Sequence, residues 1–172
     1  DTTPTITGTA DSVDDLTVVV NGVTYIEGAG NLTDNGDGTW TLIIPAGNAL
    51  PDGTYDVVAT ATDAAGNASS DITTDELVID TAAPTVPTVD ALVTNNSTPT
   101  ITGTADSVDD LTVVVNGVTY TECDGNLTDN GDNTFSLVIP TGNALPDGTY
   151  DVVATATDAA GNASSDITTD EL

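Results

Sequence analysis

Residues 145–158 read LPDGTYDVVATATD, and this stretch decides the fold class. Tyr150, Val152, Ala154 and Ala156 alternate with mostly polar residues, which is the period of a β-strand that is buried on one face. A Tyr at the start of such a strand, directly after a Gly turn, is typical of the tyrosine corner of immunoglobulin-like sandwiches. The stretch therefore predicts the penultimate strand of a β-sandwich.

The same stretch occurs a second time, 95 positions earlier in the chain. Sliding the sequence over itself by this offset aligns residues 1–77 with 96–172, and only ten of the 77 pairs differ. Residues 51–77 and 146–172 match without a change. A period of this length corresponds to one whole domain per copy rather than to a solenoid unit. The near-identity indicates a recent duplication.

The stretch between the two copies, residues 78–95, reads VIDTAAPTVPTVDALVTN. Pro84 and Pro87 stiffen it, as expected of a short connector. We place the domains at 1–80 and 81–172. The first copy has no counterpart of residues 81–95, so we expect it to be truncated at its N-terminal side and to miss its first strand.

The second copy carries signals for about seven short strands. The strongest is the Asn116-Gly117 pair between two runs rich in β-branched residues, which predicts a tight hairpin. The predicted strands are Val86–Val93, Pro99–Gly103, Leu111–Asn116, Val118–Glu122, Thr134–Pro140, Thr149–Asp158 and Ala163–Leu172. This number of strands in about 95 residues predicts an all-β fold of two tandem immunoglobulin-like β-sandwich domains joined end to end. Trp40 and Phe135 occupy equivalent positions and are predicted core residues.

Composition excludes several classes of function. The chain has 28 acidic residues, 24 of them Asp, and no Lys, Arg or His. Nucleic acid is not expected as a partner, because its phosphates are bound by cations, and an anionic membrane surface would repel the chain. The usual general bases, amine nucleophiles and oxyanion clamps are missing, so we do not expect an enzyme.

The acidity does not indicate disorder. The chain contains 34 Thr and 19 Val, a composition typical of strands rather than of disordered acidic segments. A single cysteine, Cys123, cannot form an internal disulfide, and we interpret it as a spare surface thiol. No stretch has the pattern of a signal peptide or a membrane span, and we expect an internal segment of a longer protein.

Four phrases resemble a known family. They are PTITGTAD at 4–11 and 99–106, DGTY at 52–55 and 147–150, ATDAAGN at 61–67 and 156–162, and VIDTAAP at 78–84. Together they resemble bacterial Ig-like tandem repeats, which fill the long middle sections of giant surface adhesins secreted by type I systems. The acidity and the near-identical copies are most similar to the extender repeats of such adhesins in marine gammaproteobacteria.

The resemblance covers essentially the whole chain and carries functional implications. In that family the repeats are spacers, often stiffened by calcium between domains, while separate regions bind the ligand. It implies an extracellular place on the bacterial surface, with neighbouring repeats of the same chain as partners. We expect a monomer without direct membrane contact. The glycine-rich nonapeptide calcium repeats of such adhesins do not occur in these residues.

A calcium site is predicted where one domain follows the other. In a sandwich of this topology the loops after the second and the penultimate strands meet at the end through which the chain enters. Calcium takes about six to eight oxygen ligands, whereas magnesium demands a tighter octahedron. Carboxylates that these loops bring close together repel one another unless a cation compensates their charge. The predicted ligands are the carboxylates of Asp80, Asp106 and Asp158, with Asn162 and linker carbonyls, and Asp109 and Asp110 lie in the same loop.

The first copy repeats this set with Asp11, Asp63 and Asn67, without an upstream Asp. For any single Asp the alternative is a turn former or a solubilising charge. The turns Asp34–Gly38 and Asp129–Asp132 match an EF-hand loop poorly, because no Glu stands at the twelfth position and no helices flank them. We predict that they are hairpin turns.

Three functions compete. The first is a structural extender that holds a distal binding region away from the cell. The second is a ligand-binding adhesin module for carbohydrate or ice, since Thr-Ile-Thr-Gly-Thr and Ala-Thr-Ala-Thr place Thr on one strand face. One Trp in 172 residues is meagre for a sugar platform. The third is an accessory domain of a secreted hydrolase.

Overall fold

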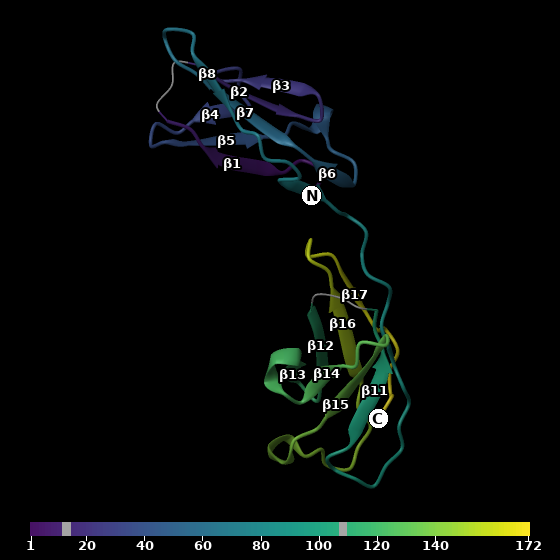
Figure 1. Ribbon diagram of the computed structural model, residues 1–172. Coiled ribbons are helices and arrows are strands. Elements are labelled where there is room, and N and C mark those ends of the chain that lie inside the picture. Colours follow the sequence, from purple (N-terminus) through teal and green to yellow (C-terminus); the bar gives the residue numbers. More distant parts are fainter. Residues whose placement is uncertain (12–14, 107–109) are drawn as a thin grey trace. The chain divides into compact units, whose positions relative to one another are not determined.

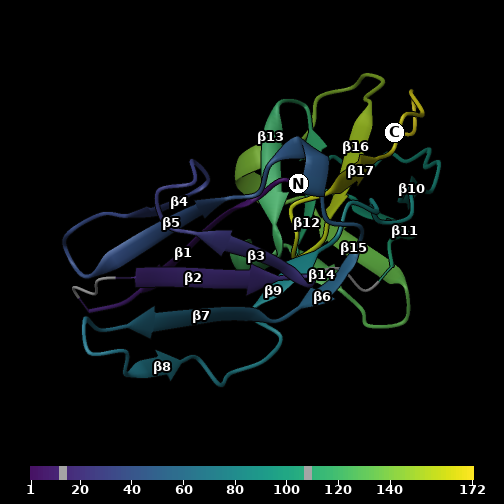
Figure 2. The same ribbon diagram turned by 90° about the horizontal axis from the view of Figure 1, so that it is seen from above.

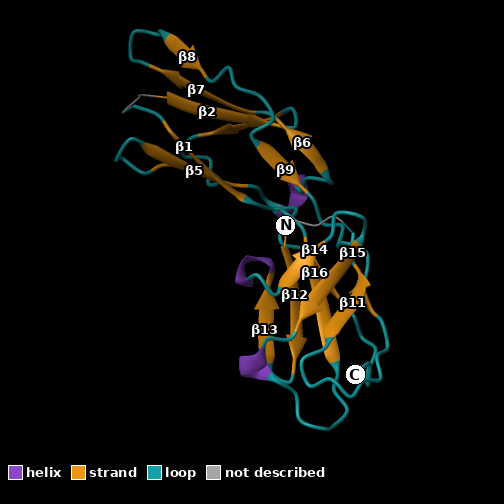
Figure 3. Ribbon diagram, turned by 60° about the horizontal axis from the view of Figure 1, so that its bottom comes forward, coloured by secondary structure: helices purple, strands orange, loops and turns teal. Residues whose placement is uncertain are grey.

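The computed structural model describes residues 1–11, 15–106 and 110–172. They divide into two units, Asp1–Thr81 and Ala82–Leu172, and each unit is built from β-strands (Figures 1 and 3). Within the described ranges, the helical elements are single 3₁₀ turns: η1 (Ala46–Asn48), η2 (Glu122–Asp124) and η3 (Thr141–Asn143). The predicted all-β class of two Ig-like domains is confirmed.

The first unit has two main antiparallel sheets and one short ladder. One sheet has the order β1-β5-β4 and the other β3-β2-β7-β8, whose last three strands lie side by side in Figure 2. The short ladder joins β6 to β9. The strands are β1 (Thr5–Thr9), β2 (Asp15–Val20), β3 (Val23–Ile26), β4 (Leu32–Asp34), β5 (Thr39–Ile43), β6 (Gly53–Tyr55), β7 (Val57–Thr62), β8 (Ala68–Ser70) and β9 (Leu77–Ile79).

The second unit repeats the two sheets and adds one strand. Its sheets have the orders β10-β11-β15-β14 and β13-β12-β16-β17. The added strand is β10, on the outer edge of β11. The strands are β10 (Thr88–Val89), β11 (Thr100–Thr104), β12 (Asp110–Val115), β13 (Val118–Thr121), β14 (Leu127–Asp129), β15 (Thr134–Val138), β16 (Val152–Thr157) and β17 (Ala163–Ser165).

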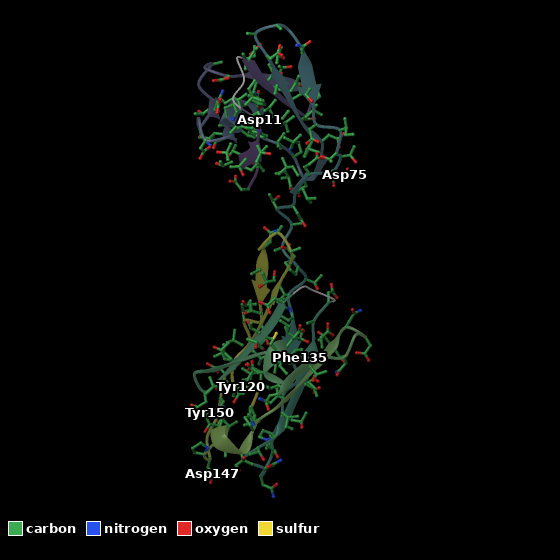
Figure 4. All side chains as sticks on the ribbon, turned by 60° about the vertical axis from the view of Figure 1, so that its left-hand side comes forward. Asp11, Asp75, Tyr120, Phe135, Asp147 and Tyr150 are labelled. Atoms are coloured by element: carbon green, nitrogen blue, oxygen red, sulfur yellow. The ribbon has the colours of Figure 1, made fainter. Side chains whose placement is uncertain are left out.

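The core of each unit lies between its sheets, as the alternation along β16 predicts. Val152, Ala154 and Ala156 are fully buried on one face of this strand. The two aromatic residues predicted for the core are also buried, with Trp40 exposing 4% and Phe135 0% of its surface. Figure 4 labels Phe135 among the side chains of the second unit. Burial of a large ring stabilises a small sandwich strongly, because its apolar area leaves water.

Two local predictions are confirmed in atomic detail. Asn116 and Gly117 have φ of +50° and +75°, the left-handed pair that a type I′ hairpin turn between β12 and β13 requires. The Tyr150 hydroxyl donates to the Pro146 carbonyl oxygen at 2.7 Å, which forms the tyrosine corner. The first unit has the same corner, from Tyr55 to Pro51.

Every predicted strand of the second copy differs from the observed one at a boundary, most by one or two residues, and the strand predicted over Thr149–Asp158 is observed as β16 at Val152–Thr157. The first strand was predicted over Val86–Val93, but only Thr88–Val89 enter a ladder as β10, because the neighbouring Pro87 cannot donate a backbone hydrogen bond. The strand predicted to reach Glu122 ends one residue earlier, where η2 begins. The last predicted strand ends as β17 at Ser165. The Asp166 N–H still donates to the Ala154 carbonyl, and the chain pairs with Tyr150 at Leu172.

The short strands β4 and β14 were not predicted. Each spans three residues with a single buried Leu, too short for a visible alternation. They pair with β5 and β15 across the two Asp-rich turns, which confirms these as hairpin turns.

Candidate metal centre

The loop after β16 is closed by one carboxylate. Oδ1 of Asp158 accepts the backbone N–H groups of Ala160 and Asn162, each at 2.9 Å. Oδ2 accepts the Asn162 side-chain amide at 2.9 Å. The backbone N–H of Asp158 in turn donates to the Asn162 carbonyl at 3.0 Å. The ATDAAGN phrase therefore encodes an Asx-type loop whose Asp and Asn depend on each other.

These hydrogen bonds set the charge of the loop. The Asn162 side-chain amide, ahead of the backbone N–H groups, holds the pKa of Asp158 below its usual value. In the first unit the Asn67 amide lowers the pKa of Asp63 in the same way. Both groups are carboxylates at neutral pH. Three donated bonds fill most of the about four acceptor positions of a carboxylate, which leaves room for one metal bond on each.

The second unit gathers its other predicted ligands at the same end. Asp110 begins β12 and pairs with Thr157, the residue before Asp158. Asp106 follows β11, and the Thr85 hydroxyl donates to its Oδ2 at 2.6 Å. The pairing of β12 with β16 and of β11 with β10 therefore places Asp106, Asp110 and Asp158 at the end where the chain enters this unit. Asp109, predicted for the same loop, lies outside the described residues.

The connector takes part in this end of the second unit. The Ser164 hydroxyl donates to the Pro84 carbonyl at 2.7 Å, two residues beyond Asn162. Pro84 and Thr85 thus contact both sheets of the second unit, at Ser164 in β17 and at Asp106 after β11. The sequence interpretation named connector carbonyls only as calcium ligands, and it missed these two hydroxyl contacts because Thr and Ser are too frequent in this chain to stand out.

Asp80 belongs to the first unit, where it directly follows β9. The remaining first-unit set, Asp11, Asp63 and Asn67, lines one groove of about 980 Å³.

The donor chemistry decides which metal these residues suit. All the predicted ligands are hard oxygen donors, and the chain has no His and one exposed Cys, so zinc does not fit. Over residues 1–11, 15–106 and 110–172, no three Asp, Glu, His or Cys side chains are grouped as a metal site. A calcium ion held within one unit would therefore need Asn, backbone carbonyl and water oxygens beside one or two carboxylates.

Another acidic residue was missed by the sequence interpretation. Glu122 begins η2, and its Oε1 is buried without a hydrogen-bond partner among the described residues. Burial raises its pKa, and the charges of Asp129 and Asp110 raise it further. The signal in the sequence is slight: Glu is rare here, and Glu122 interrupts an otherwise regular strand pattern.

Comparisons with known proteins agree with the fold. The sequence profile of the bacterial Ig-like domain matches residues 1–81 and 87–170. The fibronectin(III)-like modules of Clostridium thermocellum CbhA are 16% identical with a TM-score of 0.56, over 94% of this chain and 82% of theirs. No curated protein sequence matches the chain.

Two adhesin structures are also similar. One concerns host cell surface retention of a 1.5-MDa bacterial ice-binding adhesin, at 26% identity and a TM-score of 0.45, over 95% of this chain and 55% of the other. The second is a tetra-tandem repeat in the extending region of a large adhesion protein, at 27% identity and a TM-score of 0.41, over 96% of this chain and 44% of the other. The chain thus spans about half the length of these adhesin structures. Among the described residues, no helix has the length and hydropathy to cross a membrane.

Proposed function

Because this chain belongs to the bacterial Ig-like domain family, we propose that its two domains are extender repeats of a large bacterial surface adhesin. They would hold a distal ligand-binding region away from the cell, outside the cytoplasm. The observation that carries this proposal is the tandem near-identity of two whole sandwiches, of which only ten of 77 aligned positions differ. Repeating one domain adds length without adding a new kind of site, which is what a spacer needs.

Composition supports a spacer over a catalyst. The domains carry a net charge of −28, and a chain without cationic side chains has few groups for general acid–base or nucleophilic chemistry. A high net charge keeps long arrays soluble and keeps neighbouring chains apart. We therefore propose a non-enzymatic domain pair that acts through its length.

We further propose that calcium stabilises these domains and stiffens the junction between them. In the second unit the ligands would be Asp106, Asp110, Asp158 and Asn162, with Asp80 contributed by the preceding domain. A bound divalent cation would offset the repulsion among these carboxylates, which the chain has no side-chain cation to neutralise. Extracellular modules hold calcium with a Kd of about 10⁻⁴–10⁻³ M. At a hundredfold excess over Kd, such a site adds about 2.7 kcal/mol of stability.

Calorimetry of the whole chain tests the calcium proposal. We expect the unfolding temperature to rise by several degrees in millimolar calcium and to return to its starting value in excess chelator. Asp106→Asn should reduce this calcium-induced rise. Asp147→Asn is the matched control, because it removes the same charge from an exposed turn at the opposite end of the unit (Figure 4).

Two outcomes would contradict the calcium proposal. One is a rise that magnesium reproduces at equal ionic strength, which would indicate screening of charge. The other is an equal reduction of the calcium-induced rise in unfolding temperature by Asp106→Asn and by Asp147→Asn. Small-angle scattering tests the stiffening separately. Equal maximum dimensions with calcium and with chelator would contradict the proposal that calcium stiffens the junction, but would not contradict the proposed spacer function.

A further inference from the structure

The connector forms an edge strand on the second unit. In β10, Thr88 pairs with Thr104 and Val89 with Gly103 of β11. The Asp90 N–H then donates to the Thr102 carbonyl at 2.9 Å (β10 and β11 are adjacent in Figure 2). The segment continues to Leu92, whose N–H donates to the carbonyl of Glu171 at 2.6 Å. Residues 84–92, which we call the edge segment, thus cover one side of the second unit.

Side chains hold the edge segment as well. The Thr102 hydroxyl donates to Oδ2 of Asp90 at 2.7 Å, and the hydroxyls of Thr88 and Thr104 are hydrogen-bonded at 2.6 Å. At its N-terminal end, the segment is held by the contacts of Thr85 with Asp106 and of Pro84 with Ser164. The residues that receive the segment have identical counterparts in the first unit: Thr7, Thr9, Asp11, Ser69 and Glu76.

In the first unit, no strand lies on the outer edge of β1 among the described residues. The consequence is visible in the burial of matched positions. Ala154 and Ala156 are fully buried, whereas Ala59 and Ala61 are only partly buried. Glu171 exposes 6% of its surface, whereas Glu76 is exposed. A groove of about 980 Å³ runs between β1 and β7–β8.

Trp40 is the side chain that a main chain passing through this groove would meet. Its Nε1 is buried and has no hydrogen-bond acceptor among the described residues, and its ring packs against Gly8 and lines the groove. In the second unit the Thr88 carbonyl crosses closely over Gly103, the counterpart of Gly8, beside the Phe135 ring. A carbonyl taking the same path across the first unit would pass beside the Trp40 indole. A buried N–H without an acceptor is costly, so such a partner is favourable.

We propose that the groove of the first unit binds an extended segment with the sequence of the edge segment, which adds a strand to the free edge of β1. This is β-augmentation: main-chain hydrogen bonds supply affinity, and the pockets for alternate side chains supply specificity. The occupant is a connector of this same repeat type. It is identified by the second unit, where that sequence meets the same receiving residues. The proposal does not depend on calcium and can fail or hold independently of the extender function.

A peptide titration of the unaltered chain tests the proposal. The peptide is residues 82–95, AAPTVPTVDALVTN, which contains no aromatic residue. Trp40 is the only Trp of the chain, so any change in Trp emission reports the groove of the first unit. In buffer with chelator, we expect a saturable change in Trp40 emission and a rise in the unfolding temperature of the first unit.

Two substituted peptides make the titration specific. Val89→Asp places a charge at the residue that packs against the core of the second unit, and it should weaken binding about tenfold or more. Val86→Asp adds the same charge at a residue with 58% of its surface exposed, and it should bind within about twofold of the parent peptide. No saturable change, or equal affinity of all three peptides, would overturn the proposal.

Sedimentation of the chain without peptide is the second measurement. A monomer at the concentrations of the titration supports the assignment of the groove to a peptide segment. A dimer whose Trp40 emission depends on chain concentration, and which excess peptide does not dissociate, would assign the groove to another surface of a second copy and would overturn the proposal.

Discussion

Asp158 and Asp63 show how much one carboxylate does at the scale of a residue. Each accepts two backbone N–H groups and one Asn amide of its own loop, so each organises a turn before any ion is considered. The interpretation of Asp as a turn former and its interpretation as a calcium ligand are therefore compatible. What the loop hydrogen bonds limit is the number of oxygen lone pairs left for a metal.

This arrangement predicts the pH dependence of stability. Because the folded-state pKa of Asp158 lies below its usual value of about 3.9, its contribution is present above that pH and is lost as pH falls through the folded-state value. Denaturant unfolding of Asp158→Asn and of the unaltered chain should therefore differ by a constant amount near neutral pH. The difference should shrink below about pH 4. Asp147→Asn controls for removal of one charge, and a difference that grows in acid would contradict the prediction.

At the scale of an element, the edge strand β10 depends on the glycine opposite it. A Cβ on Gly103 would collide with the Thr88 carbonyl and the Phe135 ring. The main chain of the connector can approach β11 this closely only because that side chain is missing.

Gly103→Ala should therefore destabilise the second unit by about 1–3 kcal/mol, the usual cost of overpacking a filled site. Gly142→Ala is the matched control, because a Cβ there would meet nothing within 4 Å and the glycine does not have a positive φ. Denaturant unfolding of both variants gives the comparison. Equal stability of the two variants would mean that the edge segment shifts away from the added Cβ at little cost. The close approach of β10 to β11 would then not contribute to stability.

At the scale of the whole molecule, the two units have nearly the same sequence but bury matched residues to different extents. Ile101 exposes 1% of its surface, whereas its counterpart Ile6 is half-buried, and Ala105 and Ala10 differ in the same direction. Buried apolar area is the main source of stability, at about 25 cal/mol per Å². The two copies should therefore differ in stability although they share their fold.

Thermal unfolding should show this difference as two transitions. We expect the transition followed by Trp40 emission, which reports only the first unit, to lie below the second transition seen by calorimetry. The peptide of residues 82–95 should bring the two closer together. A single transition by both probes would show that the edge segment contributes little to stability.

The sequence by itself determined the features that depend on residues close together in the chain. The alternation from Val152 to Ala156, the Asn116-Gly117 turn and the Tyr150 corner predicted one strand, the hairpin and the sandwich, because strand period and turn chemistry are local, whereas the ends of the strands were predicted less well. The 95-residue repeat likewise determined the domain count directly. The candidate ligands Asp106 and Asp158 were also placed at one end of a domain by topology alone.

Only the tertiary structure decided what depends on pairing across the chain. No local pattern shows that Thr85 contacts Asp106 while Pro84 contacts Ser164, or that Oε1 of Glu122 is buried. Nor does one show that Trp40 lines a groove in one copy while Phe135 is covered in the other. The physical reason is that β-ladders and burial join residues far apart in sequence. The same residues are therefore open or covered according to which segment lies on the edge strand.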